Sequence, residues 1–199
     1  MGYTTYFNGT FAIDRKVDDE TAEYIRNFNR TRRMKRDPGK LAKRLGLTKK
    51  EVIAKYGEEC ELWCGDTEAL GQTSTDDVVD FNSSGKQPGL WCKWTITDDN
   101  QYIEWDGNEK FYDYVEWIEF INERILKPRG YKLTHGDVYW TGEDGDDLGM
   151  ITIEDGKVVA KPAVIVYAKY EDHPRVQSII NNYLTNEFKE VIDHKLDGN

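Results

Sequence analysis

Apolar positions recur along the chain with two different periods. Residues 3–13 are dense in aromatic and β-branched side chains, a composition typical of one opening strand or of two short strands. In residues 19–34 the period lengthens, because Ala22, Ile25 and Phe28 follow one another at helical spacing. The first part of the chain therefore predicts strand structure followed by an amphipathic helix.

Residues 40–57 predict two short amphipathic helices that meet at Gly46. Thr48 and Glu51 form a capping-box pattern at the start of the second helix. In this pattern the hydroxyl and the carboxylate satisfy backbone amides that have no partner within the helix. The pattern therefore predicts a sharp start for the second helix.

The second half of the chain shows a clearer order of elements. Residues 89–105 predict a β-hairpin, and residues 109–127 predict a helix with Asp106 as its N-cap. Asp155-Gly156 is typical of a tight turn between two strands. Other expected strands, and a closing helix, lie at residues 61–64, 78–81, 131–140, 148–159, 162–170 and 174–192.

Strands and helices do not alternate strictly in this order, which disfavours a doubly wound parallel sheet. We expect a single α+β domain over residues 1–199, with an antiparallel or mixed sheet and helices mainly on one face. The specific prediction is a ferredoxin-like variant. Residues 39–57 would form a basic helical insertion in it, and residues 158–199 a C-terminal extension of a strand and a helix.

Composition narrows the class of protein. Aromatic residues make up 13% of the chain, which argues against disorder, because disordered segments contain few aromatic side chains. No apolar run approaches the roughly 20 residues that a membrane-spanning helix needs, and the first residues lack the apolar core of a secretory signal. We therefore expect an acidic, cytoplasmic protein with no membrane partner.

Three cysteines, Cys60, Cys64 and Cys92, fit a reducing compartment, since a small odd number does not form a disulfide framework. Together with His135 they could supply four zinc ligands, but their spacing matches the usual zinc pairs loosely. Cys64 and Cys92 also lie in aromatic-rich stretches, where a free cysteine behaves as a small apolar side chain. We expect structural cysteines, with no metal and no cofactor.

The basic residues are concentrated in one segment. Between Arg26 and Tyr56 the chain has twelve basic and two acidic residues, a local charge of +10, whereas the whole chain has a formal net charge of −10. This asymmetry predicts a positive face on an acidic body, which could bind a phosphate-bearing ligand such as a nucleotide or a nucleic acid. The predicted ligand-binding residues are Arg26, Arg30, Arg32, Arg33, Lys35, Arg36 and Lys40.

Other interpretations of the basic segment stay open. It could pair with acidic residues of its own chain or of a second copy in a homo-oligomer, or it could be a solvated helix surface. Residues 41–52 also have a helix-turn-helix pattern, whose second helix would place Lys49 and Lys50 in the major groove of DNA. The match is weak, because residues 57–65 (GEECELWCG) follow directly in place of a third helix.

Catalytic chemistry has less support in the sequence. The acidic loop 142–149 could collect Mg²⁺ or Ca²⁺, so a divalent-metal-dependent hydrolase or transferase that uses clustered carboxylates is the alternative function. The loop lacks EF-hand spacing, and the chain has neither a nucleophile elbow nor a glycine-rich phosphate loop. We assign no catalytic residue. A structural or oligomeric protein is the further alternative.

Aromatic side chains fall on more than one side of the predicted helix 109–127. Tyr112, Trp117 and Phe120 lie outside its main apolar stripe. We expect this helix to be buried on two sides, mainly by its own domain.

Several motifs together resemble a set of uncharacterised proteins from phages and bacteria. They are MGYTTYF, TRRMKRDP, QPGLWCKW, IEWDGNEKFYDYVEWIEFI, LKPRGYKL and VYWTGEDGDDLG. They cover about residues 1–38 and 57–157, whereas residues 39–56 and the tail after residue 158 depart from the resemblance. The resemblance implies a ferredoxin-like layout and a small, phage-encoded accessory protein that acts by binding, and it implies no activity, cofactor or catalytic residue. With the basic segment, it leads us to expect a non-catalytic protein whose partner is a nucleotide, a nucleic acid or a host protein.

Overall fold

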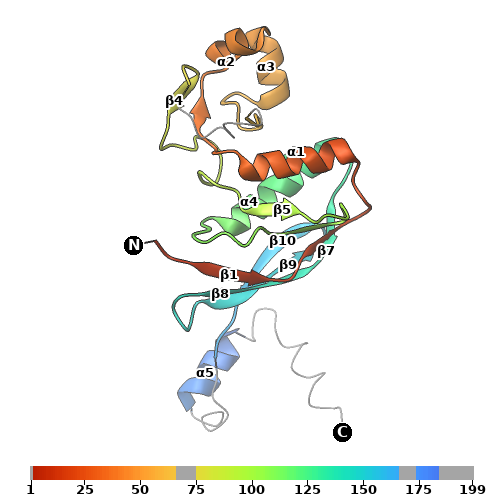
Figure 1. Cartoon of the computed structure of the whole chain (residues 1–199). Helices are drawn as coiled ribbons and strands as arrows, with labels where there is room; N and C mark the ends of the chain where they lie inside the picture. The colour runs from red at the N-terminus through yellow and green to blue at the C-terminus, as the bar shows by residue number, and fades with distance from the viewer. Residues whose placement is uncertain (1, 66–74, 166–173, 184–199) are drawn as a thin grey trace. The chain divides into compact units, whose positions relative to one another are not determined.

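The computed structural model describes residues 2–65, 75–165 and 174–183 of the chain (Figure 1). The chain divides into two compact units, Met1–Ala163 and Val164–Asn199. The described part of the second unit includes the helix α5 (Pro174–Tyr183), where a helix is expected. The rest of that expected helix, and residues 166–170 of the expected strand before it, lie outside the described residues.

Antiparallel sheets form the framework of the first unit. One sheet joins four strands in the order β1-β8-β9-β10, a second joins four in the order β5-β6-β2-β7, and a short ladder pairs β3 with β4. The strands are β1 Thr5–Asn8, β2 Phe11–Ile13, β3 Lys35–Arg36, β4 Val78–Asp80, β5 Trp94–Ile96, β6 Tyr102–Trp105, β7 Leu133–His135, β8 Asp137–Gly142, β9 Leu148–Glu154 and β10 Lys157–Pro162.

Helices complete the unit and confirm the α+β class. They are α1 Asp19–Arg30, α2 Pro38–Leu45, α3 Lys49–Tyr56, α4 Tyr114–Phe120, the π-helix η1 Ile121–Leu126 and the 3₁₀ turn η2 Lys127–Arg129. Helices α1 and α4 lie on the same side of the two four-stranded sheets (Figure 1). Their apolar side chains meet those of the strands in a main core, in which Ile25, Trp94, Trp117, Ile118 and Ile151 are fully buried or nearly so.

The two four-stranded sheets share one bent ribbon. β1 pairs with β8 in one sheet, and their neighbours along the chain, β2 and β7, pair in the other. The bend falls at Gly9 and Gly136, whose φ angles are +119° and +147°. A Cβ atom at Gly136 would lie 2.3 Å from the Thr10 carbonyl oxygen, and one at Gly9 would lie 2.2 Å from that of Asp137. Glycine is required because the two backbones approach too closely for a side chain.

The helix expected over residues 109–127 begins later and changes its winding. Its buried residues come in neighbouring pairs four positions apart: Trp117 and Ile118, Ile121 and Asn122, Ile125 and Leu126. A four-residue repeat is longer than the 3.6-residue period of an α-helix. The wider π winding of η1, in which the backbone N–H of Lys127 donates to the Asn122 carbonyl, keeps these pairs against the core.

Burial of this helix on two sides is confirmed for Trp117 and Phe120. Trp117 is 0% exposed, and the ring of Phe120 stacks on that of Phe28 from α1 at a centroid distance of 5.8 Å. Tyr112 differs, because it precedes the helix and is 51% exposed. The aromatic residues of the helix therefore serve mainly the core of their own unit.

Asp106 is not the N-cap of this helix, so that prediction is wrong. Its carboxylate accepts hydrogen bonds from Asn29 Nδ2 at 2.8 Å and from the backbone N–H of Asn108 at 2.9 Å. The position before the helix is Asp113, which has a φ of +53° and makes no side-chain cap. An aspartate that bonds a nearby backbone amide in a turn competes with its use as a helix cap.

Other expected elements are found with shifted bounds. α1 ends at Arg30, because Thr31 adopts an extended conformation and its N–H donates to the Phe28 carbonyl. Residues 61–64 form no strand, because residues 61 and 62 lie in a turn and residues 63 and 64 are irregular. The capping box of Thr48 and Glu51 is confirmed at the start of α3.

The bend between the sheets gives a test of the fold. We expect Gly136→Ala to lower the free energy of unfolding by about 2 kcal/mol or more, because alanine adds both a strained φ and a clash with Thr10. Gly145→Ala is the matched control, since a Cβ there meets no atom within 4 Å. Urea unfolding of both variants measures the difference, and equal stability of the two would contradict the requirement for glycine.

Candidate functional site

Arg33, a predicted ligand-binding residue, is buried in the interior. It is 2% exposed. Its Nε donates to Gln87 Oε1 at 2.7 Å, and its Nη2 donates to the Glu61 carbonyl oxygen at 2.6 Å. The guanidinium carbon lies 3.9 Å from the centroid of the Phe28 ring. Arg33 therefore supports the main core and is not presented to a ligand at the surface.

Arg36 is buried at a second position. Its Nη1 donates to Asp77 Oδ2 at 2.6 Å, and both side chains are at most 2% exposed. The Nε of Arg44 lies 3.3 Å from the other oxygen of the same carboxylate. Both guanidinium groups also lie over the Trp63 ring, at 4.0 Å for Arg36 and 4.9 Å for Arg44. One buried carboxylate thus joins β3 to α2.

The other five predicted residues lie nearer the surface and differ in their contacts. Three of them have partners: Arg26 donates to Asn100 Oδ1, Arg32 donates to the Phe81 carbonyl, and Lys35 forms an ion pair with Glu59. Arg30 and Lys40 are exposed, and their side chains form no hydrogen bond or ion pair with a described residue. The seven side chains therefore do not form one continuous surface.

Exposed cations are instead gathered on the two short helices. Lys40 and Lys43 lie on α2, Lys49 and Lys50 lie on α3, and all four are exposed. None of the four forms an ion pair with a carboxylate in the described part of the chain. We call these four lysines the basic face. The sequence singled out Lys49 and Lys50 through the helix-turn-helix pattern, whereas Lys43 was not among the predicted ligand-binding residues.

A carboxylate at the start of α2 belongs to the helix cap. Asp37 accepts a hydrogen bond from the backbone N–H of Lys40 at 2.8 Å. That bond, with the nearby charges of Lys49 and Lys40, lowers the pKa of Asp37. Asp37 is therefore ionised at neutral pH and reduces the positive potential at one end of the basic face.

A cavity of about 770 Å³ lies beside the basic face. Its lining residues are Lys40, Lys43, Arg44, Thr75, Asp76 and Asp77. Asp77 is neutralised by its two arginine partners, whereas Asp76 is exposed. The cavity therefore presents the ammonium groups of Lys40 and Lys43 and the carboxylate of Asp76 to any ligand that enters it, whereas Arg44 and the Thr75 hydroxyl are engaged by Asp77.

A small core of its own holds α2 and α3 in place. Its buried members are Leu41, Ala42, Val52, Cys60 and Trp63. This small core is separate from the main core, which contains Cys92. Cys60 and Cys92 are thus built into two different clusters, and burial raises the pKa of each to about 12.

The acidic loop 142–149 uses its carboxylates to fix the N-terminal segment. Asp147 accepts hydrogen bonds from the Tyr3 hydroxyl at 2.7 Å and from Trp140 Nε1 at 3.0 Å. Glu143 accepts one from the backbone N–H of Thr4 at 2.8 Å. Among the described residues, no group of three or more His, Cys, Asp or Glu side chains is placed to hold a metal ion.

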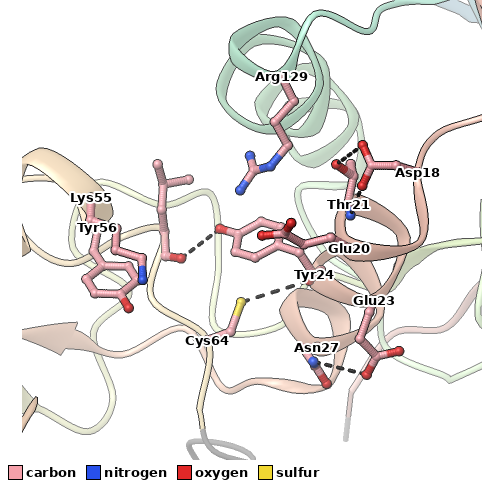
Figure 2. Close-up of a pocket in the computed structure, with 11 residues that line it drawn as sticks. Asp18, Glu20, Thr21, Glu23, Tyr24, Asn27, Lys55, Tyr56, Cys64 and Arg129 are labelled. Atoms are coloured by element: carbon pink, nitrogen blue, oxygen red, sulfur yellow. Dashed lines mark hydrogen bonds between the residues drawn. The ribbon is translucent and has the colours of Figure 1, made fainter.

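A second cavity, of about 680 Å³, opens between α1 and the end of α3. Figure 2 shows Tyr24 between Arg129 and Cys64, with Lys55 and Tyr56 across the cavity from Asp18 and Glu23. We call this space the α1–α3 cavity. No residue predicted to bind a ligand lines it. The sequence gives no signal for it, because its walls come from segments that are distant along the chain.

Comparison with known proteins gives no relative from which a function could be transferred. No family model matches the chain, and neither a curated protein nor a solved structure matches it. Among the described residues, no helix is long and apolar enough to cross a membrane. Function must therefore be inferred from the chain's own residues.

The buried carboxylate of Asp77 makes stability depend on pH. Burial alone would raise the pKa of Asp77, but hydrogen bonds from Thr75 and Arg36 outweigh it and leave the pKa below its ordinary value. The stabilisation is therefore complete above the unfolded pKa of about 3.9 and is lost as the pH falls through the lower folded pKa.

We expect Asp77→Asn to lower the free energy of unfolding by about 3 kcal/mol at pH 7, because Arg36 is left buried without its counter-charge. Asp98→Asn, at an exposed position, serves as the control and should change little. Urea unfolding from pH 7 down to acid measures both effects. A wild-type chain and an Asp77→Asn variant of equal stability at pH 7 would contradict this role.

Proposed function

We propose that the protein is a non-catalytic binding protein, whose basic face engages a phosphate-bearing ligand, either a nucleic acid or a nucleotide. One observation carries the proposal. Lys40, Lys43, Lys49 and Lys50 project from two adjacent helices without a carboxylate partner among the described residues. Cations without internal partners retain their full charge for an external anion.

The buried contacts that hold α2 and α3 in place support the proposal. The side chains of the small core and the Arg36–Asp77–Arg44 cluster hold α2 and α3 to the rest of the unit. A rigid mount lowers the entropy lost on binding, because the lysine-bearing helices do not need to be ordered by the ligand. Arg33 and Arg36 thus act beneath the surface, and the four lysines of the basic face act on it.

The charge distribution requires a ligand that binds locally. The remainder of the chain is acidic, so a ligand must approach the basic face locally and avoid the rest of the molecule. Each phosphate is a compact anion that a lysine ammonium can contact as a point charge. The resulting affinity would fall with added salt, because bound counter-ions are released when phosphates are neutralised.

We also propose, on the resemblance to phage and bacterial proteins, that the protein is phage-encoded and acts in the cytoplasm of a bacterial host. A ferredoxin-like variant remains our proposal for the finer description of the fold. These proposals concern the origin, the location and the fold of the protein, and they do not alter which residues form the basic face.

Salt-dependent binding tests the proposed function. We expect fluorescence anisotropy with a labelled duplex, a labelled single strand and a labelled nucleotide to detect binding of at least one of them by the wild-type chain. Lys40→Glu/Lys43→Glu and Lys49→Glu/Lys50→Glu should each weaken that binding. For a nucleic acid, each double variant should also reduce the slope of log affinity against log salt by roughly 2, since each lysine contact contributes about 0.9.

Lys16→Glu/Lys132→Glu is the matched control. It makes the same change of net charge at exposed positions outside α2 and α3, so it should leave the affinity close to that of the wild type. Absence of binding to all three probes would refute the proposal. Equal weakening by the control would show that only net charge matters and would remove the special role of the basic face.

A further inference from the structure

An exposed aromatic ring lies at the end of the β3–β4 ladder that is farther from the basic face. Phe81 directly follows β4 and is 38% exposed. The guanidinium carbon of Arg32 lies 4.3 Å from the centroid of this ring and covers one of its faces. We call Arg32 and Phe81 the stacked pair. Because Phe81 stays partly open to solvent, its ring is available for contact with a ligand.

Arg32 holds the ring in this exposed position. Its Nε and Nη2 atoms both donate to the Phe81 carbonyl oxygen, at 3.2 and 3.1 Å. The guanidinium carbon also lies 5.7 Å from the centroid of the Trp91 ring, so two aromatic side chains share one arginine. The ring is therefore fixed before any ligand arrives, which reduces the entropy lost on binding.

The ladder connects the stacked pair to the basic face. β4 begins beside α2 (Figure 1), since Asp77, the residue before β4, lines the same cavity as Lys40 and Lys43. β4 then runs antiparallel to β3 and ends one residue before Phe81. The four residues of chain from Asp77 to Phe81 span at most about 14 Å. The lysines and the exposed ring are therefore within reach of one extended ligand.

The charged residues next to the stacked pair balance one another. Asp80 lies opposite Lys35 in the ladder, and Lys35 forms an ion pair with Glu59 at 3.0 Å. Together with Arg32 they are two cations and two anions. This end of the ladder therefore offers a ligand mainly the face of a ring, whereas the basic face offers charge.

A ring and a group of cations at this separation suit an unpaired nucleic acid strand. Proteins that bind single strands combine cations, which contact the phosphates, with aromatic rings, on which the bases stack. In a duplex each base is already stacked on its neighbours, so a surface ring reaches a base only if the duplex is unstacked. Four nucleotides at about 3.4 Å each already span the distance along β4.

We propose that the protein binds single-stranded nucleic acid along the β3–β4 ladder, with phosphates at the basic face and one base stacked on Phe81. This inference rests on the proposed phosphate binding and adds to it the unpaired strand as the ligand. The guanidinium group of Arg32 supports the ring from behind by cation–π attraction. DNA and RNA share the phosphates and the base faces, and the test compares the two.

The test uses the full chain and strands of equal length with and without bases. Fluorescence anisotropy measures binding of labelled oligothymidylate, labelled oligouridylate, an abasic deoxyribose-phosphate strand and an oligothymidylate–oligoadenylate duplex, each about 12 nucleotides long. At the same salt concentration we expect oligothymidylate or oligouridylate to bind about tenfold more tightly than the abasic strand. It should also bind more tightly than the duplex. The abasic strand has the same phosphates, so this difference measures stacking.

A matched pair of variants locates the stacking. Phe81→Leu keeps an apolar side chain but removes the ring, so it should bind the preferred strand about tenfold more weakly and the abasic strand as before. Its slope of log affinity against log salt should equal that of the wild type, because no phosphate contact is lost. Tyr102→Leu is the control, since Tyr102 is 37% exposed on β6, in another sheet, and should keep wild-type affinity. Circular dichroism checks that both variants are folded.

Equal affinity for the abasic strand and the oligonucleotides would overturn the inference, and so would a duplex that binds as tightly as the single strand. It is also overturned if Phe81→Leu retains wild-type affinity or changes the salt slope, or if Tyr102→Leu loses as much affinity as Phe81→Leu. In each of these results the chain still binds phosphate, so the proposed function stands. Absence of binding to every probe, in contrast, refutes both.

Discussion

Two buried guanidinium groups, three residues apart, connect the parts of the first unit. Arg33 lies against Phe28 of the main core and bonds the backbone at Glu61, whereas Arg36 lies against Trp63 of the small core. Both are desolvated, so each must find neighbouring acceptors to offset the loss of water. Those acceptors, Glu61 and Asp77, come from the segment that follows α3. The position of α2 and α3 depends on this pair of contacts.

The same contacts explain why the charge pattern predicted a basic surface without identifying which cationic residues are exposed on it. In this region the spacing of apolar residues correctly predicted α2 and α3, and the capping box at Thr48 is also present. The residues between α1 and α2 are extended, however, and have no helical period that would separate buried from exposed cations. Arg33 and Arg36 are buried by partners more than twenty residues away, and no local pattern contains that information.

Contacts between residues that are distant along the chain also explain where predictions from local sequence patterns fail. The period of apolar residues predicted a helix near residues 109–127, and a helix is present, but Asp106 bonds Asn29 of α1 instead of capping it. The repeat of buried pairs imposes the π winding of η1, which α-helical periodicity cannot anticipate. The α1–α3 cavity likewise depends on α1, α3 and Arg129 meeting in space, so the sequence alone gave no hint of it.

The bent ribbon constrains how the strands can align. A slip of one residue would turn each side chain to the opposite face of its sheet. In this ribbon it would also bring a side chain into the crossing point, where the facing backbone oxygen leaves room for hydrogen alone. Gly9 and Gly136 thus fix the strand register of both sheets, because only the correct register places a glycine on each side of the crossing.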